Sequence, residues 1–290
     1  REMCARYGAA YTESEMVSAK ALCFGDKKSL TLLRRCSGRS PFSIQLFGDD
    51  PAFMAKAAKF ILPYAPDMID LNMGCPVPKV AGNGSGSALM KDPAKAAAIT
   101  AAVAEAVPVP VTVKIRKGWD GQSVNAPSFA RLMEQSGAAA IAVHGRTRQQ
   151  MYRPPVDRDI IRQVKKSVSI PVIGNGGITD AASAEEMYRE TGCDLVMVAQ
   201  GSYGRPWIFS EIRSYLESGV IPVEPALDEK LDIMLEHIAM MEARRVAGWY
   251  LKGMRGAAQF RFLCSSLTSY EDLKLLAAQV KAREKVSEEA

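Results

Sequence analysis

A single cysteine, Cys75, follows a short apolar run in the stretch DLNMGCPVPK, residues 70–79. In this position a thiol can pack in the core, bind a metal, attack as a nucleophile or donate a proton. A free thiol has a pKa of about 8.5 and is mostly protonated at neutral pH, which suits a general acid; a nucleophilic thiolate needs a neighbouring base or a helix N-terminus. Asn72 adds an amide close by. The residue types alone leave both roles open.

The other cysteines and the histidines argue against a metal site. The six cysteines are scattered without a CxxC pair and the chain has two histidines, so we expect no metal centre. Scattered thiols are typical of a reducing compartment. The sequence has no apolar run near the roughly 18 residues that cross a bilayer and no signal-peptide pattern. We therefore expect a cytoplasmic protein that does not enter membranes.

Polar residues stand near the ends of four successive apolar runs: Gln45 in IQLFG, Asn72 in DLNMG, Lys114 in VTVKI and His144 in AVHGR. In a barrel of parallel strands, alternate residues point inward and functional groups lie at the carboxyl ends. A lysine, a histidine and two amides on one rim would be costly to bury without a polar ligand. We therefore predict a shared ligand site, with four unrelated rim or core residues as the alternative.

A glycine-rich stretch, GNGGI (174–178), ends another apolar run. Glycines there let backbone N–H groups approach an anion, and a helix N-terminus follows. Because such barrels bind phosphate at their last two loops, we predict a phosphorylated cofactor, with a tight turn as the alternative. The stretch GNGSGSALM (82–90) does not directly follow a strand, so it is a weak dinucleotide signal. We interpret it as part of a mobile loop that starts at Cys75 and covers the mouth of the barrel.

Alternating strand and helix patterns place these residues on an α/β fold with a parallel sheet. The predicted helices span 51–62, 92–106, 127–136, 156–166 and 180–190. The predicted strands span 10–17, 43–48, 68–74, 111–116, 140–145, 171–177 and 194–200, which is one strand short of a (β/α)8 TIM barrel. Because the chain opens in a helical pattern that ends at Gly8, we expect the first strand of the barrel to lie upstream of residue 1.

A purely helical pattern begins at about residue 226, after the proline-rich joint VIPVEPAL (220–227). We therefore predict a barrel domain over residues 1–225 and a small all-α helical bundle over 226–290. Residues 243–270 combine aromatic and basic residues and contain no Asp or Glu. Such a face suits a phosphate backbone, and a bundle core with a solvated face is the alternative. The basic residues are Arg244, Arg245, Lys252, Arg255 and Arg261.

These motifs, in this order, resemble one enzyme family, and the similarity covers nearly the whole chain. The chain resembles the tRNA-dihydrouridine synthases in EMVSAKAL (15–22), IQLFG (44–48), DLNMGCPVPKV (70–80), GSGSALM (84–90), VTVKIRKGW (111–119), VHGRTRQQMY (143–152), GNGGI (174–178) and GRPWIF (204–209). The stretch WYLKGMRGAAQFR (249–261) resembles the C-terminal helical domain of the bacterial B-type members.

The resemblance implies an FMN-dependent oxidoreductase that reduces the C5=C6 bond of a uridine in tRNA, with NADPH as the electron source. It implies that Cys75 is the catalytic acid, that Asn72 lies at the flavin and the target base, and that the helical domain holds the tRNA. Position 17 of the tRNA is the favoured target, and we expect a monomer. The flavin would be held by Gln45, Lys114 and His144, with Asn175, Gly176 and Gly177 at its phosphate end.

Some stretches depart from the family pattern. Many members have an arginine at the end of the last barrel strand, where this chain has Ala199 and Gln200 near the expected FMN phosphate. RPPVDR (153–158) replaces an SGKADW-like run, and the PMAG-like flavin contacts of the first strand have no counterpart. Two other functions remain as alternatives: a small-molecule flavin reductase of the dihydroorotate or dihydropyrimidine dehydrogenase type, and a non-catalytic tRNA-binding protein.

Overall fold

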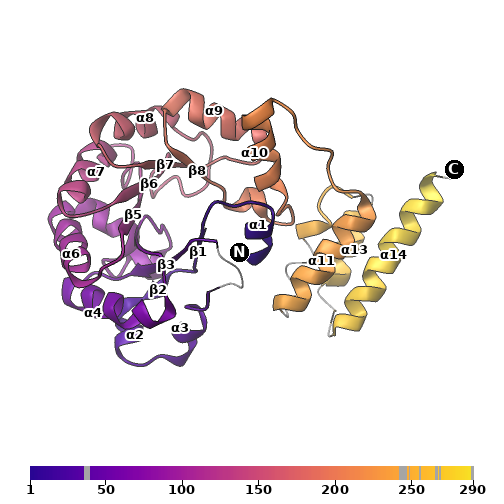
Figure 1. Ribbon diagram of the computed structural model, residues 1–290, viewed down its shortest axis with the longest axis horizontal. Coiled ribbons are helices and arrows are strands. Elements are labelled where there is room, and N and C mark those ends of the chain that lie inside the picture. Colours follow the sequence, from indigo (N-terminus) through magenta and orange to yellow (C-terminus); the bar gives the residue numbers. More distant parts are fainter. Residues whose placement is uncertain are drawn as a thin grey trace.

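The computed structural model describes residues 1–35, 40–241, 247, 249–254, 256–264, 267 and 269–288. A curved parallel sheet lies inside a ring of helices, and a second group of helices lies beside it (Figure 1). Parallel strands need crossover connections, and helices supply them here because each can bury one apolar face on the sheet. The predicted fold class is confirmed: the sheet is a half-barrel consistent with a (β/α)8 TIM barrel, and a helical region follows it.

The sheet has the order β1-β3-β4-β5-β6-β7-β8, with β2 also on β3. Within the described ranges β1 and β8 do not pair, and a cavity of about 790 Å³ lies along this open seam. The expected strand upstream of residue 1 stays a prediction. The strands are β1 (Thr12–Glu13), β2 (Val17–Ser18), β3 (Phe42–Phe47), β4 (Met68–Met73), β5 (Val111–Arg116), β6 (Ala140–His144), β7 (Val172–Asn175) and β8 (Leu195–Met197).

The single strand predicted over 10–17 is wrong in its extent, because β1 and β2 replace it and both pair with β3. Ser14 separates the two short strands. Its backbone N–H donates to the carbonyl of Ser43 at 2.9 Å, but its hydroxyl accepts from the backbone N–H of Gln45 at 3.0 Å. A side chain therefore replaces a carbonyl in the ladder, and the alternation of residue types does not reveal this interruption.

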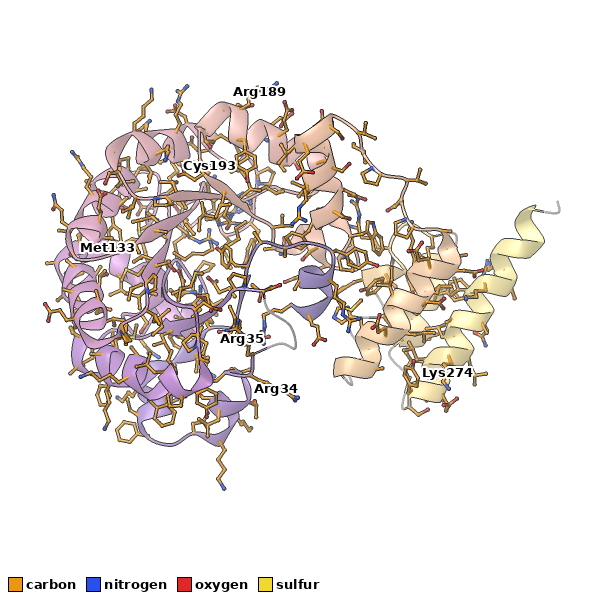
Figure 2. The ribbon with its side chains drawn as sticks, viewed as in Figure 1. Arg34, Arg35, Met133, Arg189, Cys193 and Lys274 are labelled. Carbon is orange, nitrogen blue, oxygen red and sulfur yellow. The ribbon has the colours of Figure 1, made fainter. Side chains whose placement is uncertain are left out.

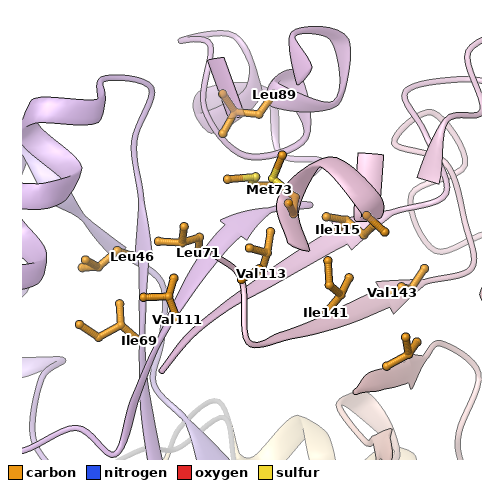
Figure 3. Packing of buried hydrophobic residues seen from close by; sticks show 14 of the residues in the cluster. Leu46, Ile69, Leu71, Met73, Leu89, Val111, Val113, Ile115, Ile141 and Val143 are labelled. Carbon is orange, nitrogen blue, oxygen red and sulfur yellow. The ribbon is translucent and has the colours of Figure 1, made fainter. Parts of the chain in front are cut away.

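The two faces of the sheet differ in chemistry. Successive side chains of a strand point to opposite faces, so Asp70 and Asn72 of β4 share the inner face. They pair in register with Thr112 and Lys114 of β5. The outer face is apolar and packs against the helices, so a dry outer layer holds the polar inner face in place. Outer residues that are fully or almost fully buried include Ile69, Leu71, Met73, Val111, Val113, Ile115, Ile141 and Val143 (Figure 3).

Helices cover the outer face of the sheet. Four of them begin at an aspartate, Asp50, Asp92, Asp157 or Asp180, whose side chain accepts a backbone N–H of the first turn. All five helices predicted between the strands are confirmed to within two residues at either end. The covering helices are α4 (Pro51–Ile61), α6 (Pro93–Ala106), α7 (Ala126–Gln135), α8 (Arg158–Ser167), α9 (Ala181–Thr191) and α10 (Ile208–Ser218).

The orientation of single side chains follows this layering. Met133 of α7 is fully buried against the sheet, whereas Arg189 of α9 lies on the outer surface (Figure 2). Between β2 and β3 the chain forms the short helices α2 (Ala19–Cys23) and α3 (Lys27–Thr31). These elements put the apolar core between the sheet and the helices and leave the interior of the barrel to polar groups.

The segment after β4 is not the open loop that the sequence suggested. It forms α5 (Pro78–Ala81) and the 3-10 helix η2 (Gly86–Lys91), and Gly86 to Met90 are buried. Leu89 belongs to the barrel core and lies close to Met73 (Figure 3). A Cβ on Gly86 would lie 3.1 Å from the Cβ of Cys75. The segment therefore packs closely against the site of the cysteine instead of standing free.

The C-terminal region consists of α11 (Leu227–Met241), α13 (Ala257–Leu263), α14 (Tyr270–Glu288) and residues around them. Its core also takes in Met3 of α1 (Glu2–Arg6) and Trp207, and Arg6 forms an ion pair with Glu236. The ring of Tyr203 stacks on that of Trp249 at 4.4 Å between centroids. The domain boundary at residue 226 stays a prediction. None of the helices in the described part is long and apolar enough to cross a membrane.

Candidate active site

The polar residues predicted to share a site do converge. Gln45, Asn72, Lys114 and His144 lie on four neighbouring strands, β3 to β6. Asn72 Nδ2 donates a hydrogen bond to Gln45 Oε1 at 2.7 Å. Lys114 Nζ donates to Asn175 Oδ1 at 2.8 Å, which adds β7 to the cluster. The cross-strand register therefore brings these side chains together, as the alternation of residue types predicts.

Cys75 stands at the point where the chain leaves β4. Its backbone N–H donates to Asn72 Oδ1 at 2.9 Å, and that of Gly74 donates to the same oxygen at 3.2 Å. This is an Asx turn, in which an asparagine side chain holds the backbone that follows it. The thiol is free and half-buried. The asparagine therefore fixes the position from which the thiol acts.

Arg116 lies beside this turn. Its Nε donates to the carbonyl of Gly74 at 2.8 Å, and its terminal nitrogen donates to the carbonyls of Thr147 and Met151. Burial lowers the pKa of Arg116 to about 10, and the nearby Tyr152 and Cys75 act in the opposite direction. Arg116 therefore ties the backbone just before Cys75 to the residues that follow β6.

Lys114 is the cation in the middle of the cluster. Burial lowers its pKa to about 8, although the carboxyls of Glu13 and Asp70 counteract this effect. Burial therefore disfavours the positive charge of the lysine, and the two carboxyls partly restore it. Such a group can offer a strong hydrogen bond to a carbonyl or an anionic atom of a ligand.

His144 is a neutral member of the cluster. Burial lowers its pKa to about 2, and the charges of Lys114, Arg116 and Arg146 lower it further in the same direction. Gly176 follows β7 with φ of +114°, and a Cβ there would lie 2.6 Å from Cδ2 of the His144 ring. The backbone of the GNGG turn thus lies directly on the imidazole, which only glycine allows.

The sequence patterns did not single out two carboxyls of the interior. Asp70 Oδ1 accepts from Thr112 Oγ1 at 2.5 Å, and its Oδ2 accepts from Gln45 Nε2 at 2.8 Å. Gln45 Nε2 also donates to Glu13 Oε1 at 2.7 Å. Burial raises the pKa of Asp70 to about 6 and that of Glu13 well above its usual range. Spacing offered a signal for Asp70, because it stands two residues before Asn72 and hence on the same face.

Cations also gather around the mouth of the barrel. Lys91 Nζ lies 4.1 Å from the centroid of the Trp119 ring, and Arg148 Cζ lies 4.6 Å from it. We call Lys91, Arg116, Arg146 and Arg148 the rim cations. Within the described residues, none of the four has a carboxylate partner within 4 Å. Unpaired cations on one rim favour an anionic ligand.

Other predicted residues lie less centrally. Gly177 has φ of +71° in the turn after β7. Ala199 lines the cavity at the seam together with Gln45 and Glu13. Gln200 is exposed at the start of η3 (Gln200–Ser202), and its contacts in the described part are local. Over the described ranges, hydrogen bonds therefore join Gln45, Asn72 and Cys75 in one group and Lys114 and Asn175 in another, and Gln200 belongs to neither.

The predicted RNA-binding residues are only partly described. Lys252 and Arg261 are exposed, and Arg244, Arg245 and Arg255 lie outside the described residues. Of the interleaved aromatic side chains, Tyr250 and Phe260 are buried in the helical core, whereas Phe262 is 78% exposed. The alternative of a bundle core therefore holds for two of these aromatic residues.

The interior suits a heteroaromatic, phosphorylated cofactor. A neutral imidazole, a charged lysine and two amides offer donors and acceptors of both kinds. In addition, Arg146 Nε is buried without a hydrogen-bond partner, and its guanidinium lies 3.4 Å from His144 Nε2. An unpartnered buried donor beside the cluster calls for an acceptor from a ligand. Among the described residues no group of histidine, cysteine and carboxylate side chains could hold a metal ion.

Comparisons with known proteins identify the chain's relatives. Residues 1–289 match the family model described as Dihydrouridine synthase (Dus). A probable tRNA-dihydrouridine synthase of Rickettsia conorii is 44% identical over 274 residues, which cover 90% of this chain and 82% of the relative. The tRNA-dihydrouridine synthase B of Pseudomonas aeruginosa is 41% identical over 273 residues, covering 90% and 82%. That of Pseudomonas putida is 40% identical over 293 residues, covering 97% and 86%.

Proposed function

The chain belongs to the dihydrouridine synthase family, and we propose that it binds FMN and reduces the C5=C6 bond of a uridine in tRNA with electrons from NADPH. The observation that carries the proposal is the placement of Cys75. Its backbone is fixed by Asn72, and the same asparagine is bonded to the polar cluster of the interior. The backbone of the proposed proton donor and Gln45, one of the proposed cofactor ligands, are therefore connected by hydrogen bonds through Asn72.

Different residues of the site donate the proton and hold the cofactor. When bound, FMN supplies a hydride to C6 of the uracil. Cys75 donates the proton to C5, and Arg116 holds the backbone beside it through the carbonyl of Gly74. Asn72 would lie at the flavin and the target base. Gln45, Lys114 and His144 would hold the cofactor, with Asn175, Gly176, Gly177 and Ala199 at its phosphate end and Gln200 as a more distant candidate.

The RNA must present an unstacked base to the mouth of a barrel. Of the rim cations, Lys91 and Arg148 lie at Trp119 and can pair with phosphates of the flipped-out strand. Arg116 is buried and donates to backbone carbonyls instead. Exposed Lys252 and Arg261 extend the cationic surface to the helical region, and we assign Arg244, Arg245 and Arg255 the same role from the sequence. Since relatives are named tRNA-dihydrouridine synthase B, we propose uridine 17 as the target and the cytoplasm as the location.

Replacement of Cys75 by alanine tests the chemical role. The variant Cys75→Ala should bind FMN and tRNA as the wild type does but form dihydrouridine about 10²- to 10⁴-fold more slowly, the usual contribution of a general acid. Cys23→Ala is the matched control, because Cys23 is also a free, half-buried thiol but lies on α2 outside the site. Dihydrouridine formed per minute is measured by mass spectrometry of digested tRNA. A wild-type rate for Cys75→Ala would refute the acid role.

A small-molecule flavin reductase is the main rival function. The rim cations favour the tRNA substrate over a neutral dihydropyrimidine, which has no need of unpaired cations around the mouth, but they do not discriminate against the carboxylate of orotate. NADPH consumption with unmodified tRNA, free uridine and orotate, each of which has a C5=C6 bond to reduce, separates the two: the proposed enzyme responds to tRNA alone.

A further inference from the structure

Asp70 begins a chain of hydrogen bonds that ends at the backbone of Cys75. The carboxylate accepts from Gln45 Nε2 at 2.8 Å. Gln45 Oε1 accepts from Asn72 Nδ2 at 2.7 Å, and Asn72 Oδ1 accepts from the N–H of Cys75 at 2.9 Å. Every link is made by side chains of β3 and β4, which are neighbouring strands. Among the described residues, the hydrogen bonds of Asp70 go to Gln45 and Thr112 and not to the loop that carries the thiol.

The polarity of this chain originates at Asp70. An ionised carboxylate only accepts hydrogen bonds, so Gln45 must turn its NH2 group toward Asp70 and its oxygen toward Asn72. Asn72 must then meet that oxygen with its own NH2 group, which leaves its oxygen for the N–H of Cys75. The two ends of an amide have nearly the same shape, so packing alone would not distinguish this arrangement from the flipped one.

The surroundings of Asp70 keep this acceptor in place. It is 2% exposed, and its second oxygen accepts from Thr112 Oγ1 at 2.5 Å. The Cα atom of Asp70 pairs in register with those of Gln45 and Thr112 on the two adjacent strands. Glu13 accepts from the same NH2 group of Gln45, but it lies at the open seam. Asp70 is thus the enclosed anchor of the amide pair.

We propose that Asp70 is a positioning residue, whose carboxylate sets the orientation of Gln45 and Asn72 and through them fixes the Gly74–Cys75 turn. It touches neither the base nor the reacting atoms. If Asp70 no longer accepts a hydrogen bond, the side-chain amide of Gln45 can rotate so that its NH2 group faces the NH2 group of Asn72. Two donors then face each other, and the amide of Asn72 is no longer held with its oxygen toward the N–H of Cys75. The Gly74–Cys75 turn then becomes more mobile, and the thiol leaves the position needed for proton transfer. The catalytic consequence rests on the proposed function; the effect on the turn does not.

Three substitutions distinguish this role from a general loss of stability. Asp70→Ala removes the acceptor. Asp70→Asn keeps it, because the amide oxygen can face Gln45 while the NH2 group donates to the hydroxyl of Thr112. Thr112→Val is the matched control, since it removes one hydrogen bond of Asp70 and leaves the contact with Gln45. Asp70→Ser is prepared as a smaller polar replacement in case Asp70→Ala does not fold.

Two readouts are taken on the flavin-loaded protein. Hydrogen exchange reports the amides of Gly74 and Cys75, and single-turnover kinetics report dihydrouridine formation in tRNA. Asp70→Ala should speed the exchange of these two amides and slow turnover by about tenfold or more, the change that corresponds to one lost hydrogen bond to a charged group. The dissociation constant for tRNA should stay within about twofold, because the rim cations are untouched. Asp70→Asn and Thr112→Val should resemble the wild type in both readouts.

The outcomes separate the two proposals. Unchanged exchange at Gly74 and Cys75 in Asp70→Ala and Asp70→Ser would overturn the positioning role, as would equal effects of Asp70→Ala and Thr112→Val. If the wild type makes no dihydrouridine but the exchange pattern follows the prediction, the proposed function fails and the positioning of the turn stands.

Discussion

Gly176 offers a direct test of how the backbone after β7 shapes the site. Its φ of +114° is unfavourable for any residue with a side chain, and holding alanine there costs about 1–3 kcal/mol. The added Cβ would lie 2.6 Å from Cδ2 and 2.8 Å from Nε2 of His144. Overpacking of this kind costs about 1–3 kcal/mol more. Gly176→Ala should therefore lower the free energy of unfolding by about 2–6 kcal/mol and displace the imidazole.

Gly219→Ala is the matched control for the backbone term. Gly219 has φ of +72°, and a Cβ there would meet no atom within 4 Å. Gly219→Ala should therefore lower the free energy of unfolding only by the cost of a left-handed backbone at alanine, about 1–2 kcal/mol. Urea denaturation measures both variants, and flavin fluorescence measures FMN retention. Gly176→Ala should lose FMN, whereas Gly219→Ala should keep it.

A double-mutant cycle identifies the clash itself. In a His144→Ala background the ring is absent, so Gly176→Ala should cost about 1–3 kcal/mol less than it does in the wild type. Equal costs of Gly176→Ala in both backgrounds, or equal costs of Gly176→Ala and Gly219→Ala, would refute the contact between this turn and the imidazole.

Two further predictions concern RNA binding and pH. Lys252→Glu with Arg261→Glu should weaken tRNA binding at least tenfold in a filter-binding assay and leave NADPH oxidation by oxygen unchanged; a parallel loss of both would contradict a separate RNA surface. The pKa of His144 is lowered from 6.5 to about 2, so below pH 6.5 the unfolded chain takes up a proton that the folded chain refuses. The free energy of unfolding should therefore decrease as the pH is lowered, by up to about 1.4 kcal/mol per pH unit. His144→Asn should remove this decrease in urea titrations between pH 7 and 6. Asp70, whose pKa burial raises to about 6, acts in the opposite sense over part of the same range, because the folded chain begins to bind its proton above that pH. The difference in slope between the wild type and His144→Asn therefore isolates the histidine, and an unchanged slope would count against the buried neutral imidazole.

The sequence was sufficient to predict where polar groups would converge. Lys114 and Asn72 each interrupt an apolar run, and alternation along a strand determines which face a residue occupies. The structure pairs these two residues in register, as parallel neighbours require. The positions of the helices could also be predicted from the sequence, because N-terminal aspartates such as Asp92 and Asp180 mark the first turn.

Other features depend on contacts that no local pattern encodes. The interruption at Ser14 arises from one side-chain hydrogen bond to the next strand. The packing of 86–90 against β4 depends on Leu89 entering the core, although its glycines and serines are typical of a loop. The spacing of Asp70 from Asn72 placed it on the inner face, but its role appears only in the structure, where Gln45 and Thr112 lie on either side of it.

The most direct test of the account is the dihydrouridine content of tRNA from cells that lack their own synthases and express this chain's gene. Mass spectrometry of the isolated tRNA should detect dihydrouridine at position 17 when the gene carries Cys75 and none above background when it carries Cys75→Ala. Dihydrouridine at wild-type levels with Cys75→Ala, or none with the unaltered gene although the protein is folded and holds flavin, would contradict the account.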